Sequence, residues 1–224
     1  LSASAFDHVV VLMELEGQEL VIDPTVEGQL GPLEDREPTN LVQVLPLREG
    51  QDSFVRIPLN RDLPHVEVHQ VWDIPRATPD TLEVTTLYRY DMADSMRATL
   101  STWDMVLYAE ELRSFYAADY PDITVARQPT WTSRPDGSLE LTERWSLPEF
   151  SAGTEHFVMA RDIYTYLPMP PDSVRQTPVG VVHPFRVKQT LDVHLADPML
   201  FANLEKRVFA TPAFTLEVEH RGSG

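Results

Sequence analysis

Residues 6–25 read FDHVVVLMELEGQELVIDPT, which is two alternating apolar runs joined at Gly17. Alternation with a period of two around a glycine-bearing turn is typical of a β-hairpin. His8 begins the first run and Asp23 ends the second. If the turn lies near residues 16–18, two antiparallel strands bring the imidazole of His8 close to the carboxylate of Asp23. The stretch therefore predicts a histidine–aspartate pair at the open end of a hairpin.

A histidine beside a carboxylate has a recognisable chemistry. The carboxylate fixes the tautomer of the imidazole and raises its basicity, as in the base and orienting acid of a nucleophile–base–orienter triad. The candidate catalytic residues are therefore His8 as base and Asp23 as orienter. The alternative is a hairpin with a chance histidine and an Asp-Pro turn, because aspartate before proline is common turn chemistry.

This motif resembles the end of the core domain of bacterial transglutaminase-like proteins, which share a papain-like Cys-His-Asp triad. The residues that carry the resemblance are DHVVV at 7–11 and IDPT at 22–25. Residues 82–120 also resemble the region after the core in the DUF3857-containing subgroup. The resemblance implies that His8 and Asp23 serve a thiolate in acyl transfer or amide hydrolysis, with a protein or peptide as substrate.

The resemblance also predicts what is missing from the chain. It contains no cysteine, and the family's nucleophile lies upstream of the matched motif. The chain begins at Leu1 rather than at methionine, so we expect a C-terminal part of a longer protein, inactive alone, with the upstream half as its partner. Residues 1–60 would be the tail of the core, and residues 61–224 a β-rich accessory region with helices near 91–120. Family members are often exported, which implies a periplasmic location in a bacterium.

A second reading comes from a different class of protein. The chain would then be a non-catalytic β-rich binding or scaffold module, with partner surfaces on its sheet edges. The sequence upstream discriminates between the two readings. A cysteine at a helix N-terminus, where the thiol pKa is lowered, favours the enzyme; its absence favours the binding module.

Composition excludes several other classes. The 224 residues include 35 acidic and 18 basic side chains, a net charge of −17. Nucleic acids and anionic membranes require basic patches, so neither is expected as a partner. No run reaches the eighteen or so apolar residues that a membrane span needs. The absence of cysteine excludes disulfides and thiolate metal sites.

The remaining pattern predicts an α+β fold, a mainly antiparallel β-sheet with a two-helix insertion packing on it. Helical spacing begins at Asp91, read as an N-cap, and a second helix begins near Ser101 and ends before Pro121. Residues 161–167 fit either a strand or a short helix. The expected strands lie at 41–46, 53–58, 65–72, 81–90, 123–131, 139–147, 154–158, 185–195 and 214–220.

Other chemistry-bearing residues give weaker signals. Alternation is expected to place His65, Glu67 and His69 on one strand face, where two imidazoles and a carboxylate are a possible metal set. The alternative, a solvated strand face, is the stronger reading. Asp192-x-His194 is a similar and weaker pattern. With no phosphate-binding glycine loop and no HExxH motif, we expect no cofactor.

Overall fold

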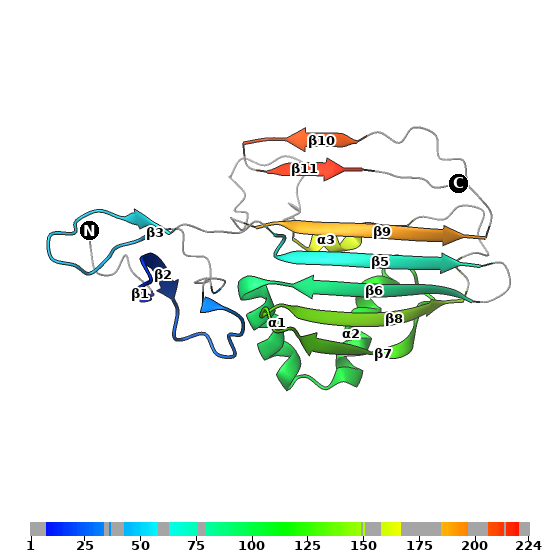
Figure 1. Cartoon of the computed structure of the whole chain (residues 1–224). Coiled ribbons are helices and arrows are strands. Elements are labelled where there is room, and N and C mark those ends of the chain that lie inside the picture. The colour runs from blue at the N-terminus through cyan, green and yellow to red at the C-terminus, as the bar shows by residue number, and fades with distance from the viewer. Residues whose placement is uncertain are drawn as a thin grey trace, which may run out of the picture.

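A five-stranded sheet in the order β7-β8-β6-β5-β9 forms the centre of the protein (Figure 1). Neighbouring strands run antiparallel, except that β9 is parallel to β5. The expected α+β class with a mostly antiparallel sheet is therefore confirmed. The strands are β5 (Val66–Ile74), β6 (Asp80–Tyr88), β7 (Thr124–Ser133), β8 (Leu139–Leu147) and β9 (Val187–Leu195). The computed structural model describes residues 8–33, 36, 43–57, 63–75, 79–148, 150, 158–166, 185–196, 206–212 and 214–219.

Two helices connect β6 to β7 and cover one face of the sheet, α1 (Tyr90–Thr102) and α2 (Met105–Ala117). The predicted insertion is therefore present, although both caps differ from the expectation. Asp91 lies inside the first turn of α1 and is not its N-cap. The carboxylate of Asp104 caps α2, because it accepts the first free amides, so this helix begins after Asp104 rather than near Ser101.

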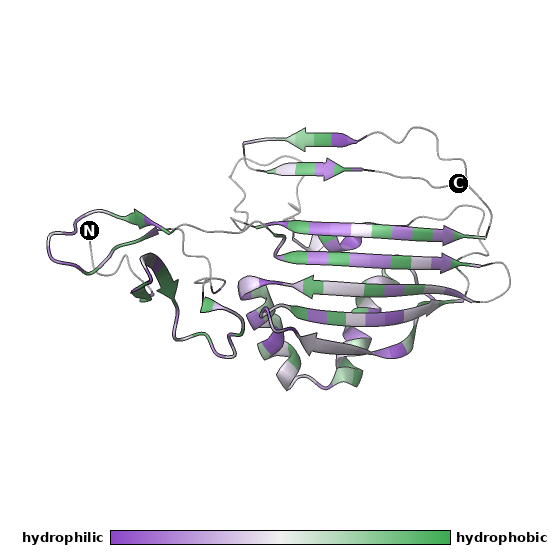
Figure 2. Ribbon diagram, in the orientation of Figure 1, coloured by the Kyte–Doolittle hydropathy of each residue, from purple (hydrophilic) through white to green (hydrophobic). Residues whose placement is uncertain are grey.

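Apolar and polar residues alternate along β5, β6 and β9, visible as green and purple bands in Figure 2. This alternation divides the sheet into an apolar and a polar face. Along β5 and β6 every second side chain is buried. Tyr116 of α2 packs on Trp145 with ring centroids 5.4 Å apart, which places α2 on the buried face. The most deeply buried apolar side chains of the core are Val66, Val68, Trp72, Leu82, Val84, Ala93, Leu100, Ile123, Leu139, Leu141, Trp145 and Leu147.

Polar groups interrupt the apolar face at two tryptophans. The indole of Trp72 donates to Gln70 (3.2 Å), and the indole of Trp145 donates to Glu143 (3.1 Å). The side-chain amide of Gln70 in turn donates a hydrogen bond to the carboxylate of Asp162 (2.6 Å). Asp162 belongs to the short helix α3 (Arg161–Thr165), which therefore lies on the same face as α1 and α2. The core therefore contains two separate polar clusters, one at Gln70 and Asp162 and one at Glu143.

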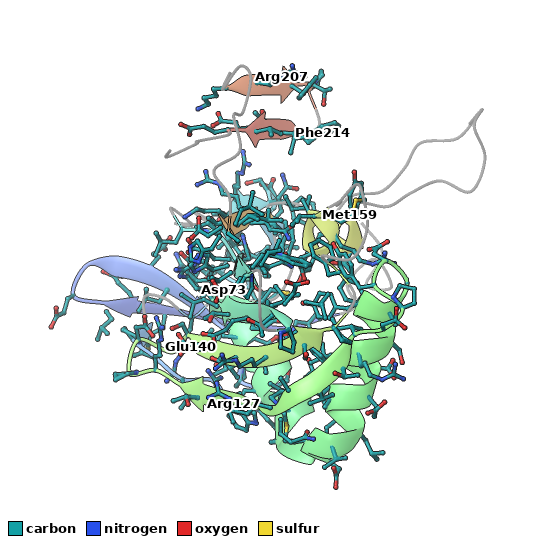
Figure 3. All side chains as sticks on the ribbon, turned by 90° about the vertical axis from the view of Figure 1, so that its right-hand side faces the viewer. Asp73, Arg127, Glu140, Met159, Arg207 and Phe214 are labelled. Atoms are coloured by element: carbon teal, nitrogen blue, oxygen red, sulfur yellow. The ribbon has the colours of Figure 1, made fainter. Side chains whose placement is uncertain are left out.

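In the described part of the chain, three two-stranded ribbons lie outside the main sheet. They are β1 (Val11–Leu15) with β2 (Gln18–Ile22), β3 (Gln43–Val44) with β4 (Val55–Arg56), and β10 (Arg207–Ala210) with β11 (Thr215–Val218). Figure 3 shows the last ribbon, marked by Arg207 and Phe214, standing apart from the sheet. Within the described part of the chain, no helix is long and apolar enough to cross a membrane.

Candidate functional site

The candidate site lies at the open end of the β1–β2 hairpin. Val11 pairs with Ile22, and the turn falls at Glu16 and Gly17, as predicted. Both turn residues have positive φ, 52° and 81°, the pattern of tight hairpin turns that match the twist of the strands. This register brings the chain just before β1 beside the chain just after β2.

The hairpin brings His8 and Asp23 together. His8 lies three residues before β1, Asp23 directly follows β2, and the imidazole Nε2 is 2.5 Å from the carboxylate Oδ2. The predicted proximity of these two side chains is therefore confirmed. Because Nε2 faces the acid, a neutral ring donates from Nε2 and keeps Nδ1 as the nitrogen that can accept a proton. The His8 side chain is 36% exposed, so a reacting group can approach the ring.

Asp23 is held from its other side by Thr25. The Thr25 hydroxyl (2.6 Å) and backbone amide (3.0 Å) both donate to Oδ1, which leaves Oδ2 for His8. Burial raises the pKa of Asp23, but the bonds from Thr25 and then from His8 outweigh it, so the net pKa is lowered. Asp23 is therefore a fixed carboxylate at neutral pH, as an orienting acid must be.

Replacing Thr25 with valine is expected to raise the pKa of Asp23, because it removes the hydroxyl donor to the carboxylate while the backbone amide remains. The measurement is a titration of the Asp23 carboxyl carbon by NMR. Thr25→Ser keeps the hydroxyl and serves as the control, with the pKa as in the parent chain. An unchanged pKa in Thr25→Val would show that Thr25 does not hold the acid.

Two other histidine–aspartate pairs differ from this one in burial. His69 contacts Asp192 and His194 contacts Asp73, each at 2.7 Å, on the open face of β5 and β9. Asp192 is 52% and Asp73 is 55% exposed, whereas Asp23 is 4% exposed. Asp73, the acid of the second pair, is labelled in Figure 3 and belongs to β5. Exposed ion pairs of this kind contribute little to stability. Among the described histidine–aspartate pairs, only the His8 pair has a buried acid.

The expectation that His65, Glu67 and His69 share one strand face is wrong for His65. β5 begins at Val66, and the His65 ring is buried against Phe185 at 4.9 Å between centroids. Glu67 instead binds Arg89 and Lys188, at 3.0 and 2.6 Å.

The ring of His69 contacts the carboxylate of Asp192 on the exposed side of the strand. The three side chains are thus engaged with different partners, and the described part of the chain contains no cluster of three or more metal-ligating residues. The three remaining histidines of the sequence, His156, His183 and His220, lie outside the described residues.

Sequence reasoning did not identify the buried acids Glu143 and Asp162. Glu143 is fully buried, and burial raises its pKa to about 8; burial likewise raises the pKa of Asp162 to about 6. One signal was available for Glu143. In LELTERWSL, residues 139–147, it occupies an inward position of the alternation, between Leu141 and Trp145.

The chain was compared with protein-family models, curated proteins and solved structures, and none of them matches.

Proposed function

We propose that this chain supplies the base and the orienting acid of a transglutaminase-like site, whose thiol comes from an upstream half of the same protein. The observation that carries the proposal is the 2.5 Å contact between His8 Nε2 and the buried carboxylate of Asp23. It supports the roles because the acid occupies one ring nitrogen and leaves Nδ1 for the nucleophile.

In the proposed reaction, His8 Nδ1 takes the proton of the thiol as its sulfur attacks a carboxamide carbonyl. Asp23 stabilises the resulting imidazolium through Nε2. The carbon–nitrogen bond breaks, His8 gives the proton to the leaving ammonia or amine, and the acyl group remains on sulfur as a thioester. An incoming amine or water then loses a proton to His8 and attacks the thioester, which releases the amide or acid and the thiol.

An exposed apolar side of the hairpin supports the idea of an upstream partner. Val9 is 75% exposed, and Val11 and Leu15 are also exposed. A two-stranded hairpin alone is marginally stable in water, so a surface that covers these side chains would stabilise it. The proposed location of the parent protein is extracytoplasmic, as in the family that the motif resembles.

The test is an acyl-transfer assay on the longer protein, with a fluorescent primary amine and a glutamine-containing protein as substrates. His8→Ala is expected to lower the rate about 10²–10⁴-fold, the usual contribution of a general acid–base group. His194→Ala is the matched control, because that histidine also contacts an aspartate, and it should leave the rate unchanged.

The isolated 224-residue chain should incorporate no amine, since it has no thiol. The proposal fails if the protein has no upstream cysteine, or if His8→Ala reacts as fast as the parent.

A binding or scaffold module remains the second candidate, and the β10–β11 ribbon favours it. Val208, Phe209 and Phe214 are each at least half exposed there. Val208 and Phe209 are consecutive and point to opposite faces, so each face of the ribbon offers an exposed apolar side chain to a partner. This candidate predicts that substitutions in the ribbon abolish partner binding. His8→Ala should then alter only the contacts around residue 8.

A further inference from the structure

A buried arginine connects the loop after the hairpin to the main sheet. Arg97 lies on α1, and its guanidinium donates to the carbonyl oxygens of Gly28 (2.8 Å) and Gly137 (2.7 Å). It also donates to Ser133 Oγ (3.0 Å) and Asp94 Oδ1 (2.5 Å). Gly28 belongs to the loop that follows Asp23, whereas Ser133 and Gly137 lie at the turn between β7 and β8. One rigid fork of donors therefore joins three separate segments.

The same loop touches that turn through two glycines. Gly31 and Gly137 have φ of +90° and +84°, which other residues rarely adopt. A Cβ on Gly31 would lie 2.7 Å from the Asp136 carbonyl oxygen, and a Cβ on Gly137 would lie 2.5 Å from the Leu30 carbonyl oxygen. The two backbones are thus in contact, at a distance that no side chain tolerates.

Asp94 completes this junction from α1. Its carboxylate accepts from Arg97 and from the backbone amide of Leu30. Both Asp94 and Arg97 have side chains only 11% exposed. Each charge therefore depends on the other for compensation, because a buried charge without a partner is strongly unfavourable.

We infer that Arg97 is a positioning residue for the His8–Asp23 pair, because it anchors the loop that fixes Asp23. Only four residues separate Asp23 from Gly28, and one of them, Thr25, already binds the Asp23 carboxylate. An anchor this close limits how far the Asp23 backbone can move. The junction thereby gives a marginal hairpin a rigid support that its own two strands do not provide. The catalytic meaning of this role rests on the proposed function, but the physical claim does not.

The test uses Gly31→Ala in the full chain. The added methyl must displace the loop from the Asp136 carbonyl, and the alanine must also adopt a strained positive φ. We expect amide hydrogen exchange within Val11–Ile22 to accelerate about tenfold or more, as local opening becomes easier. The NMR-titrated pKa of Asp23 should rise toward that of an exposed aspartate, while the tryptophan fluorescence of the sheet stays as in the parent.

Gly50→Ala is the matched control. Gly50 also has a positive φ, +78°, but an added Cβ meets nothing within 4 Å, so the variant carries the backbone strain without the collision. It should leave the exchange of Val11–Ile22 and the pKa of Asp23 unchanged. Arg97→Lys is the second variant. It keeps a positive charge beside Asp94 but loses the fork, and it should move both readouts in the same direction as Gly31→Ala.

The inference is overturned if Gly31→Ala and Arg97→Lys both leave the hairpin exchange and the Asp23 pKa as in the parent chain. It is also overturned if Gly31→Ala destroys the tryptophan signal of the sheet, because the contact then supports the whole fold and not the pair. Neither readout requires acyl transfer. Failure of the positioning role is therefore distinguishable from failure of the proposed function.

Discussion

Replacing Glu143 with glutamine is expected to make the protein more stable at pH 8, by on the order of 3 kcal/mol. Glu143 is fully buried, and burial raises its pKa to about 8 despite the hydrogen bond from Trp145; the nearby carboxylate of Asp162 raises it further. Glutamine is nearly the same shape and keeps an oxygen that accepts the Trp145 indole. It does not ionise, so it removes the cost of a charge in the core.

The sign of the effect follows from proton binding. Between the ordinary glutamate pKa of 4.5 and about 8, folded Glu143 holds a proton that the unfolded chain has released. The parent chain therefore loses stability as the pH rises through this window, by at most about 1.4 kcal/mol per pH unit for one proton. Burial also raises the pKa of Asp162, to about 6, so Asp162 likewise lowers stability as the pH rises, over a lower pH range. The stability of Glu143→Gln should therefore still depend weakly on pH.

Urea denaturation at pH 5 and pH 8 measures this difference. The parent chain should be more stable at pH 5, and Glu143→Gln should lose most of that difference. Glu83→Gln is the control, since Glu83 is an exposed glutamate on the neighbouring strand β6. This variant should leave the free energy of unfolding unchanged at both pH values. Equal pH slopes in the parent and in Glu143→Gln would show that Glu143 is ionised in the folded protein.

Trp72→Ala is expected to destabilise the protein by about 3–5 kcal/mol, the usual cost of removing a buried tryptophan. The indole is 1% exposed and packs on Tyr120 and Phe150, with ring centroids 5.1 and 5.3 Å away. Its removal leaves a cavity and also takes the indole donor from Gln70. Gln70 in turn donates to Asp162, so α3 should loosen before the rest of the chain unfolds.

The measurement for Trp72→Ala is urea denaturation followed by far-ultraviolet circular dichroism. Trp103→Ala is the control, because Trp103 is 43% exposed at the end of α1 and its loss should cost less than about 1 kcal/mol. Similar losses of stability in the two variants would show that burial of the Trp72 side chain contributes no more than an exposed tryptophan.

The strands of the main sheet were predictable because each follows the period of two. β5, β6, β7 and β8 begin and end within three residues of the predicted bounds. The helices were found for a similar reason, since Ala93, Arg97 and Leu100 are buried at helical spacing. The parallel pairing of β9 with β5 was not predictable, because alternation within a strand carries no information about its neighbour or its direction.

Part of the site was also readable from the sequence. Two strands of equal length around Glu16 and Gly17 fix the register, and the register places His8 near Asp23. Thr25 as a donor was not foreseen, although an aspartate that accepts the backbone amide two residues later is a known local arrangement. The Arg97 junction was not predictable either, since it joins Gly137, 40 residues after Arg97, to Gly28, 69 residues before it.

The most direct test of the central claim is the tautomer of His8, measured by NMR on the chain labelled with ¹⁵N-histidine. The resonances of His8 are identified by their loss in His8→Gln. At a pH where the ring is neutral, we expect protonation at Nε2 and not at Nδ1, with this preference lost in Asp23→Ala. A ring protonated at Nδ1, or a mixture of tautomers that Asp23→Ala leaves unchanged, would contradict the assignment of base and orienter.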